Sequence, residues 1–288
     1  MKLIEFALNT PPRESFQLLV RRFSRRAPLL GFDDQHPCVY VLSTGRVGSM
    51  SLADLLSHCP NVLVLHEPSP RLFRISKAVY QNPSSLLSEV LSEAFLSLRT
   101  DIIQSAMSEG RGYVETSPQG TFLASAIARA IPSARFLHMV RHPADVIRSG
   151  MRRGWYGGIS SDSTRIVPRG GTDFAIQWSD MTQFQKIAWL WSETNRWIME
   201  FSKTLPIGRT LLFRAEDLFS GKEGELQKLF AFSGSHLPIR THLDKAFARK
   251  LNTQQTGVFP EAKDWTPAMR TDLHRIAGTT AAQLGYVL

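Results

Sequence analysis

The sequence predicts an α/β fold, a doubly wound and mainly parallel sheet with helices on both faces. Between residues 37 and 152, short apolar runs alternate with longer segments of helical spacing. This alternation is typical of parallel strands joined by crossover helices. Glycine, hydroxyl or charged residues follow several of the apolar runs. They stand where the carboxyl ends of parallel strands bind ligands in such folds.

The predicted elements follow one another in regular order. Strands are expected where a short apolar run is bounded by turn residues, at 38–43, 61–65, 112–115 and 135–140. Helices or helical regions are expected where apolar residues recur at helical spacing, at 49–58, 84–109, 120–130 and 143–152. Pro143 suits the first position of the last of these helices.

Two segments interrupt this order. Residues 1–36 mix apolar and arginine positions, and we expect a lead segment packed on the domain, with an anionic membrane surface as the alternative. Residues 153–180 are rich in glycine, serine and charge, which is typical of a lid or an acceptor-side loop, although disorder gives the same composition. We expect residues 37–288 to form a single domain.

The segment from Val39 to Leu52, VYVLSTGRVGSMSL, has the order strand, small-residue loop, helix. Gly45 and Gly48 let the backbone approach an anion, and the first amides of the helix have no intrahelical partner. The loop lacks the G-x-x-x-x-G-K-[ST] spacing, and its basic residue, Arg46, lies between the glycines. The pattern predicts a phosphate loop that differs from that of nucleoside triphosphatases.

A second motif lies in RFLHMVRHPADVIRSGMRR, residues 135–153. Arg141 ends the apolar run, and Ser149 follows eight residues later, about two helical turns on. The spacing predicts that a strand-end arginine and a helix serine meet on one phosphate.

With both motifs, the chain resembles the sulfotransferase family that uses 3'-phosphoadenosine 5'-phosphosulfate (PAPS), in its bacterial or carbohydrate-type branch. The resemblance implies a P-loop-like sulfotransferase architecture and sulfuryl transfer to an acceptor hydroxyl or amine. In the family, the first loop holds the 5'-phosphosulfate, and an arginine and a serine after a later strand hold the 3'-phosphate. The implied donor-binding positions are Thr44, Gly45, Arg46, Val47, Gly48, Ser49, Met50, Ser51, Arg141 and Ser149.

Three weaker similarities extend the resemblance to about residue 265. Residues 187–201 look like the family's tryptophan-bearing central helix, and residues 211–218 like its strand ending in an acidic turn. Residues 250–265 resemble the late loop that closes over the nucleotide. The implied donor contacts there are Lys250, Asn252, Gln254 and Gly257.

The resemblance implies that Arg46 stabilises charge on the bridging oxygen, although lysine is commoner at this position in cytosolic members. Three residues at strand ends are alternatives for the base. Glu67 matches the acidic residue of carbohydrate-type members, His66 needs no pKa shift, and Glu115 follows the third strand. Instead of acting as the base, Glu67 or Glu115 could have a structural role as the ion-pair partner of an arginine.

Aromatic residues in the irregular segment, Trp155, Tyr156 and Trp178, are candidates for the acceptor pocket. They suit a ring-bearing small molecule, whereas the His-Glu-Pro turn after residue 65 resembles carbohydrate-type members. Both acceptor classes therefore remain open.

Composition narrows the other possibilities. The net charge is +9, with 34 basic against 25 acidic residues, which suits an anionic donor. We expect no nucleic-acid partner, because no such binding motif is legible. No apolar run spans a bilayer, and two cysteines without metal spacing indicate a reducing, cytoplasmic location and no metal. The alternative functions are a P-loop phosphoryl-transfer enzyme and a non-catalytic nucleotide- or polyanion-binding protein.

Overall fold

The computed structural model describes residues 31–83, 86–236 and 257–288. Its centre is a five-stranded sheet of order β2-β3-β1-β4-β5, in which every neighbouring pair is parallel. The strands are β1 (Cys38–Leu42), β2 (Val62–Leu65), β3 (Gly112–Glu115), β4 (Arg135–Val140) and β5 (Thr210–Arg214). The predicted mainly parallel sheet is confirmed. β1 lies at its centre, with later strands on both sides.

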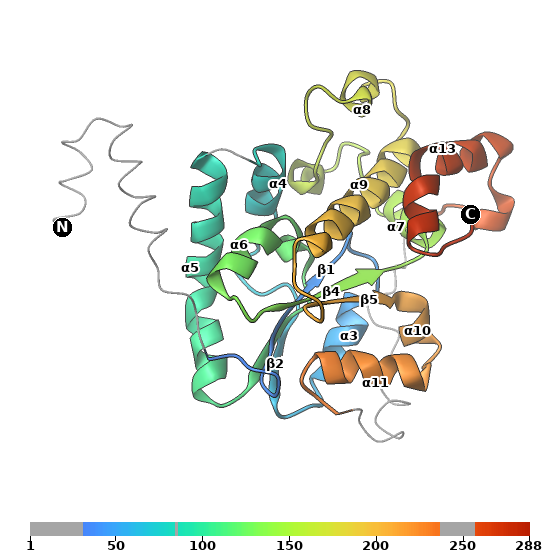
Figure 1. Ribbon diagram of the computed structural model, residues 1–288. Helices are drawn as coiled ribbons and strands as arrows, with labels where there is room; N and C mark the ends of the chain where they lie inside the picture. Colours follow the sequence, from blue (N-terminus) through green and yellow to red (C-terminus); the bar gives the residue numbers. More distant parts are fainter. Residues whose placement is uncertain (1–30, 84–85, 237–256) are drawn as a thin grey trace, which may run out of the picture.

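Helices cover both faces of this sheet, because successive residues of a strand point in opposite directions. Tyr40 and Leu42 of β1 join one buried cluster, and Val39 and Val41 join another. The first face is covered by α5 (Leu86–Ser108), α6 (Ala124–Ala130) and α9 (Gln183–Lys203), and the second by α3 (Ser49–Leu56) and α11 (Glu223–Phe232) (Figure 1). The strands are therefore mostly apolar on both faces, as buried parallel strands are.

A third buried cluster joins α7 (Pro143–Arg152), α9 and α13 (Pro267–Gln283). Trp191 of α9 is fully buried within it, and its Nε1 donates to the carbonyl of Arg141 at 3.0 Å. The tryptophan-bearing helix therefore fixes the end of β4, where the second predicted motif begins. The capping box of Thr182 and Gln185 starts α9 four residues before the predicted start at residue 187.

Several boundaries differ from the prediction. The helix expected to reach residue 58 ends at Leu56, and the helix expected from residue 120 begins as a 3₁₀ turn, η1 (Pro118–Leu123). The acidic turn after β5 is a short helix, α10 (Ala215–Phe219). The irregular segment contains η2 (Ser160–Thr164) and α8 (Asp173–Gln177).

Helix α4 (Phe73–Gln81) was not predicted, and neither was α13. Pro68 and Pro70 precede α4, so the segment has the composition of a loop at its start. α4 packs on α5 and on η1. It thereby forms one wall of the cavity described below.

The predicted lead segment, 1–36, lies outside the described residues up to position 30. Phe32 is buried in the cluster of the α5 face. Cys38 and Cys59 are free thiols and are buried, as expected for packing residues. Among the helices of the described residues, none is long and apolar enough to cross a membrane.

Candidate active site

The loop between β1 and α3 turns through left-handed backbone at three positions. Gly45, Arg46 and Gly48 have φ values of 79°, 61° and 89°. Gly48 also lies against the Phe219 ring, since a Cβ at this position would stand 2.6 Å from that ring. No side chain caps α3 at Gly48, so its first-turn amides suit an anionic ligand.

Arg46 joins this loop to α7. Its Nε donates to Oγ of Ser149 at 3.0 Å, a contact between residues 103 positions apart in the sequence. Burial and the nearby charges of Arg153 and Arg141 lower the pKa of Arg46 to about 10, while Glu67 opposes this shift. The guanidinium thus lies in an environment that favours an anionic ligand.

Arg141 lies at the end of β4, as predicted. Its Nε and Nη2 lie 3.1 and 3.0 Å from Oδ2 of Asp145, one turn into α7, and its guanidinium lies 5.4 Å from the Phe219 ring centre. Ser149 contacts Arg46 instead of Arg141, but all three line the same cavity. The two predicted phosphate motifs therefore converge on one cavity.

The late loop lies beside α7 in its described part. The Gly257 carbonyl accepts from Arg152 Nε at 2.9 Å, and the Phe259 carbonyl accepts from Arg148 Nε at 3.3 Å. Gly257 has a φ of 79°, and its backbone touches that of Arg152 so closely that a Cβ would overlap it. The other predicted contacts, Lys250, Asn252 and Gln254, lie outside the described residues.

The cavity at the carboxyl ends of β1 and β4 has a volume of about 1190 Å³. The predicted donor residues that line it are Thr44, Gly45, Arg46, Gly48, Ser49, Met50, Ser51, Arg141 and Ser149. The side chain of Val47 points away from it and packs with the cluster under α3. The Val47 side chain therefore anchors the loop on the core, and only the backbone of this residue could contact the donor.

His66 and Glu67 both line the cavity at the end of β2. His66 Nδ1 lies 2.7 Å from the Thr116 carbonyl. A carbonyl can only accept, so Nδ1 carries the hydrogen and the neutral ring keeps its lone pair on Nε2. Glu67 has a left-handed φ of 45°, and its carboxylate lies 3.8 Å from Arg71.

Glu115 is not a lining residue of that cavity. Its side chain has no exposed surface, and its Oε2 accepts from Arg99 Nε at 3.1 Å and from the Tyr113 hydroxyl at 2.8 Å. Burial raises the pKa of Glu115, and Arg99 opposes that shift. This geometry favours the structural alternative for Glu115, a buried partner of an arginine.

Comparison with known proteins identifies the family. The model of the sulfotransferase family matches residues 37–238, more than half of the chain. The chain belongs to the sulfotransferase family. The phosphoryl-transfer alternative is accordingly not favoured, and the chain is an enzyme of sulfuryl transfer.

Solved structures show the same fold. The sulfotransferase domain from the curacin biosynthetic pathway is 17% identical with a TM-score of 0.54, and the alignment covers 88% of this chain and 99% of that domain. The sulfotransferase domain from the Synechococcus PCC 7002 olefin synthase is 19% identical with a TM-score of 0.54, with 91% and 98% covered. No curated protein matches the chain.

The three aromatic residues predicted for the acceptor pocket of this sulfotransferase lie in different places. Trp155 lines the cavity, and its ring lies under the guanidinium of Arg165 at 4.1 Å. Tyr156 and Trp178 pack edge to face at 5.4 Å and are not among the lining residues. Tyr156 also donates its hydroxyl to the Ile166 carbonyl at 2.6 Å, so these two rings brace the loop that carries Trp155 and Arg165.

Sequence reasoning missed most of the cations in the cavity of the sulfotransferase. The additional lining residues are Arg71, Arg74, Lys77, Arg148, Arg152, Arg153 and Arg165. One signal was available for the α7 residues, because Arg148 and Arg152 are four apart and so share a helix face. The other signal was the spacing of three between Arg74 and Lys77, which places them next to each other on one side of α4.

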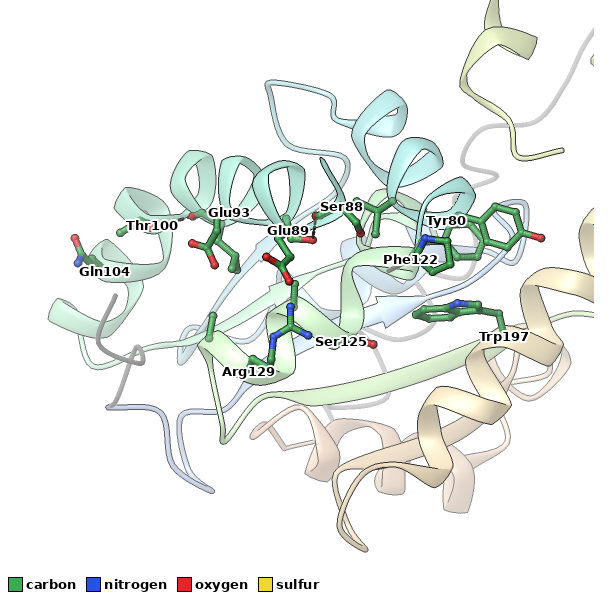
Figure 2. A pocket seen from close by; sticks show the side chains of 16 residues that line it. Tyr80, Ser88, Glu89, Glu93, Thr100, Gln104, Phe122, Ser125, Arg129 and Trp197 are labelled. Carbon is green, nitrogen blue, oxygen red and sulfur yellow. Dashed lines mark hydrogen bonds between the residues drawn. The ribbon is translucent and has the colours of Figure 1, made fainter. Parts of the chain in front are cut away.

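A second cavity of about 980 Å³ lies between the end of α4, α5, α6 and the C-terminal part of α9. Figure 2 shows Glu89 and Glu93 on α5 and Arg129 on α6 pointing into it, with Tyr80, Phe122 and Trp197 at one end. The residues that line it include neither the phosphate loop nor the end of β4. The cavity at the strand ends, which contains both predicted phosphate motifs, is therefore the candidate active site.

No group of three or more His, Cys, Asp or Glu side chains suited to a metal occurs in the described part of the chain.

Proposed function

We propose that PAPS is the sulfuryl donor and that the acceptor is the hydroxyl or amine of a small molecule or carbohydrate. The observation that carries this proposal is the hydrogen bond from Arg46 to Ser149, which joins the two phosphate motifs in one cationic cavity. A single phosphate needs one such motif, whereas PAPS presents a 5'-phosphosulfate and a separate 3'-phosphate.

The residues of the site fit this donor. The loop from Thr44 to Ser51 offers the amides at the start of α3, and the absence of a Cβ at Gly48 keeps the loop against Phe219. Arg141 gives its Nε and Nη2 to Asp145 and keeps Nη1 for a 3'-phosphate. Ser149 lines the cavity beside it, and Lys250, Asn252 and Gln254 remain predicted contacts.

The transfer is an in-line displacement. The acceptor oxygen or nitrogen forms a bond to sulfur while the bond from sulfur to the bridging oxygen breaks, and the electron pair of that bond stays on the departing phosphate. Arg46 and the loop amides stabilise the charge that develops there. His66 takes the proton of the acceptor at Nε2, because Nδ1 is fixed by Thr116. Glu67 is the alternative base.

The supporting experiment is isothermal titration of adenosine 3',5'-bisphosphate, ATP and adenosine 5'-phosphosulfate without metal. We expect binding to depend on the 3'-phosphate. Arg141→Ala should lower the affinity for the bisphosphate by about 10- to 100-fold, as expected for the loss of charge-assisted hydrogen bonds. The same variant should bind adenosine 5'-phosphosulfate almost as well as the natural chain does. Equal affinity with and without the 3'-phosphate would contradict the proposed donor.

A non-catalytic nucleotide-binding protein is the remaining alternative. It would bind the bisphosphate in the same way but would transfer no sulfuryl group from PAPS to any acceptor. Transfer of radiolabelled sulfur to a panel of hydroxyl and amine compounds separates the two possibilities.

A further inference from the structure

Three cations line the side of the active-site cavity formed by α4 and the turn before it. Arg71, Arg74 and Lys77 are all lining residues. Arg74 and Lys77 are three apart in α4 and so lie on one side of that helix, and Arg71 lies in the turn before it. Arg71 lies 3.8 Å from Glu67, the alternative base, so this row begins beside the two candidate bases. At its other end Lys77 donates from Nζ to the Ser163 carbonyl at 3.1 Å, which joins α4 to η2.

Four of the cations that line the cavity lie beside a carboxylate. Arg71, Arg141, Arg148 and Arg165 lie 3.8, 3.0, 3.9 and 3.2 Å from carboxylate oxygens of Glu67, Asp145, Glu261 and Asp162, respectively. Arg74 and Lys77 line the same cavity and form no ion pair with a carboxylate of the described residues. The carboxylates of the described chain therefore leave the charges of these two residues available to an anionic ligand.

These two cations lie on the acceptor side. The cations assigned to the donor, Arg46 and Arg141, lie on the phosphate loop and at the end of β4, whereas Arg74 and Lys77 lie on α4, which begins six residues after Glu67 and is joined to η2 through Lys77. The hydroxyl that attacks sulfur must reach His66 or Glu67. The remainder of the acceptor therefore lies next to Arg71, Arg74 and Lys77.

We propose that the acceptor of this sulfotransferase carries an anionic group, a carboxylate or a phosphate, beside the hydroxyl that is sulfonated. Arg74 and Lys77 bind this group, and Arg71 shields it from the charge of Glu67. The inference rests on the proposed PAPS-dependent function and specifies the substrate class of the same site. It also gives a role to the row of cations on α4, which donor binding does not use.

The test uses acceptors in matched pairs that differ by one charge. One pair is 4-hydroxyphenylacetate and 4-hydroxyphenylacetamide, and the other is methyl glucuronide and methyl glucoside. Transfer from radiolabelled PAPS is measured for the natural chain and for Arg74→Gln/Lys77→Gln. We expect kcat/KM to be about tenfold or more higher for the acid of a pair. The double variant should lose this preference and keep its KM for PAPS.

The control is Arg129→Gln, which removes a cation from the second cavity and should keep the preference for the acid. The proposal is overturned if neutral compounds are used as well as acids, or if the double variant slows both members of a pair equally.

Calorimetric titration of the same pairs, with and without adenosine 3',5'-bisphosphate, gives a readout that does not depend on transfer. Acid-selective binding that Arg74→Gln/Lys77→Gln abolishes supports the inference even where neither pair is sulfonated, and no selectivity in either assay overturns it. Failure of the bisphosphate itself to bind would instead contradict the proposed donor.

Discussion

The guanidinium of Arg99 lies 3.1 Å from the carboxylate of Glu115, and neither side chain has any exposed surface. Arg99 also donates from Nη2 to the carbonyls of Pro68 and Pro70, at 3.1 and 3.4 Å. The ion pair thereby ties α5 and β3 to the loop that follows Glu67. Through Arg99, Glu115 therefore supports the loop that follows Glu67, the alternative base.

Replacing Glu115 with glutamine should destabilise the fold. The amide keeps the shape of the side chain but leaves the buried charge of Arg99 without its counter-charge, which costs on the order of 3–5 kcal/mol. Unfolding by urea, followed by circular dichroism, measures the loss. Glu109→Gln is the matched control, because Glu109 pairs with Arg111 at the surface and its removal should change the free energy of unfolding far less. Equal stability of the two variants would contradict a supporting ion pair.

Replacing Arg46 should affect turnover far more than folding. Arg46→Ala removes the cation expected to stabilise the departing phosphate, and kcat should fall about 100- to 1000-fold with little change in the melting temperature. Ser149→Ala removes the partner of Arg46 but keeps the charge, so it should raise KM for PAPS more than it lowers kcat. A normal kcat in Arg46→Ala would remove this residue from the mechanism.

The identity of the base can be read from kcat/KM of two variants. If His66 takes the proton, His66→Gln should be nearly inactive, because the glutamine amide cannot act as a base. Glu67→Gln should then keep a measurable rate. The opposite result, an inactive Glu67→Gln with an active His66→Gln, would assign the base to Glu67.

The sequence predicts those features of the structure that depend on residues close to one another in the chain. The order strand, loop and helix around Gly45 and Gly48 and the Pro143 start of α7 are local patterns, and both predictions agree with the structure. The helix α4 begins after two prolines, so its amphipathic spacing was masked by a loop-like start. That Arg74 and Lys77 of this helix line the active-site cavity follows only from the way α4 packs in the fold.

Long-range contacts were beyond sequence reasoning. Glu115 is an acid at a strand end by its sequence, and only the packing of α5 places Arg99 against it. In the same way, Val47 lies within the predicted phosphate loop, yet the left-handed turn at Gly48 sends its side chain into the core. A motif therefore locates a loop, but tertiary packing decides which of its side chains meet a ligand.

His138 should make the stability of the fold depend on pH. It is buried on β4, and its Nε2 donates to Oδ1 of Asn195 at 2.8 Å, while the Asn195 amide donates to the Trp191 carbonyl. Burial lowers the pKa of His138 to about 4, and the hydrogen bond to Asn195 opposes the shift. In the unfolded chain the pKa is about 6.5.

Between these two pKa values the unfolded chain binds a proton that the folded chain does not. The free energy of unfolding should therefore fall as the pH drops from about 6.5 to about 4, by on the order of 3 kcal/mol, and this contribution should then level off. Urea unfolding of the natural chain and of His138→Gln at several pH values isolates the contribution, since carboxylates titrate alike in both. The contribution of His138 to the pH dependence of the free energy of unfolding should be absent in His138→Gln. It should remain in the control His274→Gln, because His274 is exposed. A slope unchanged by His138→Gln would mean that another group carries the dependence.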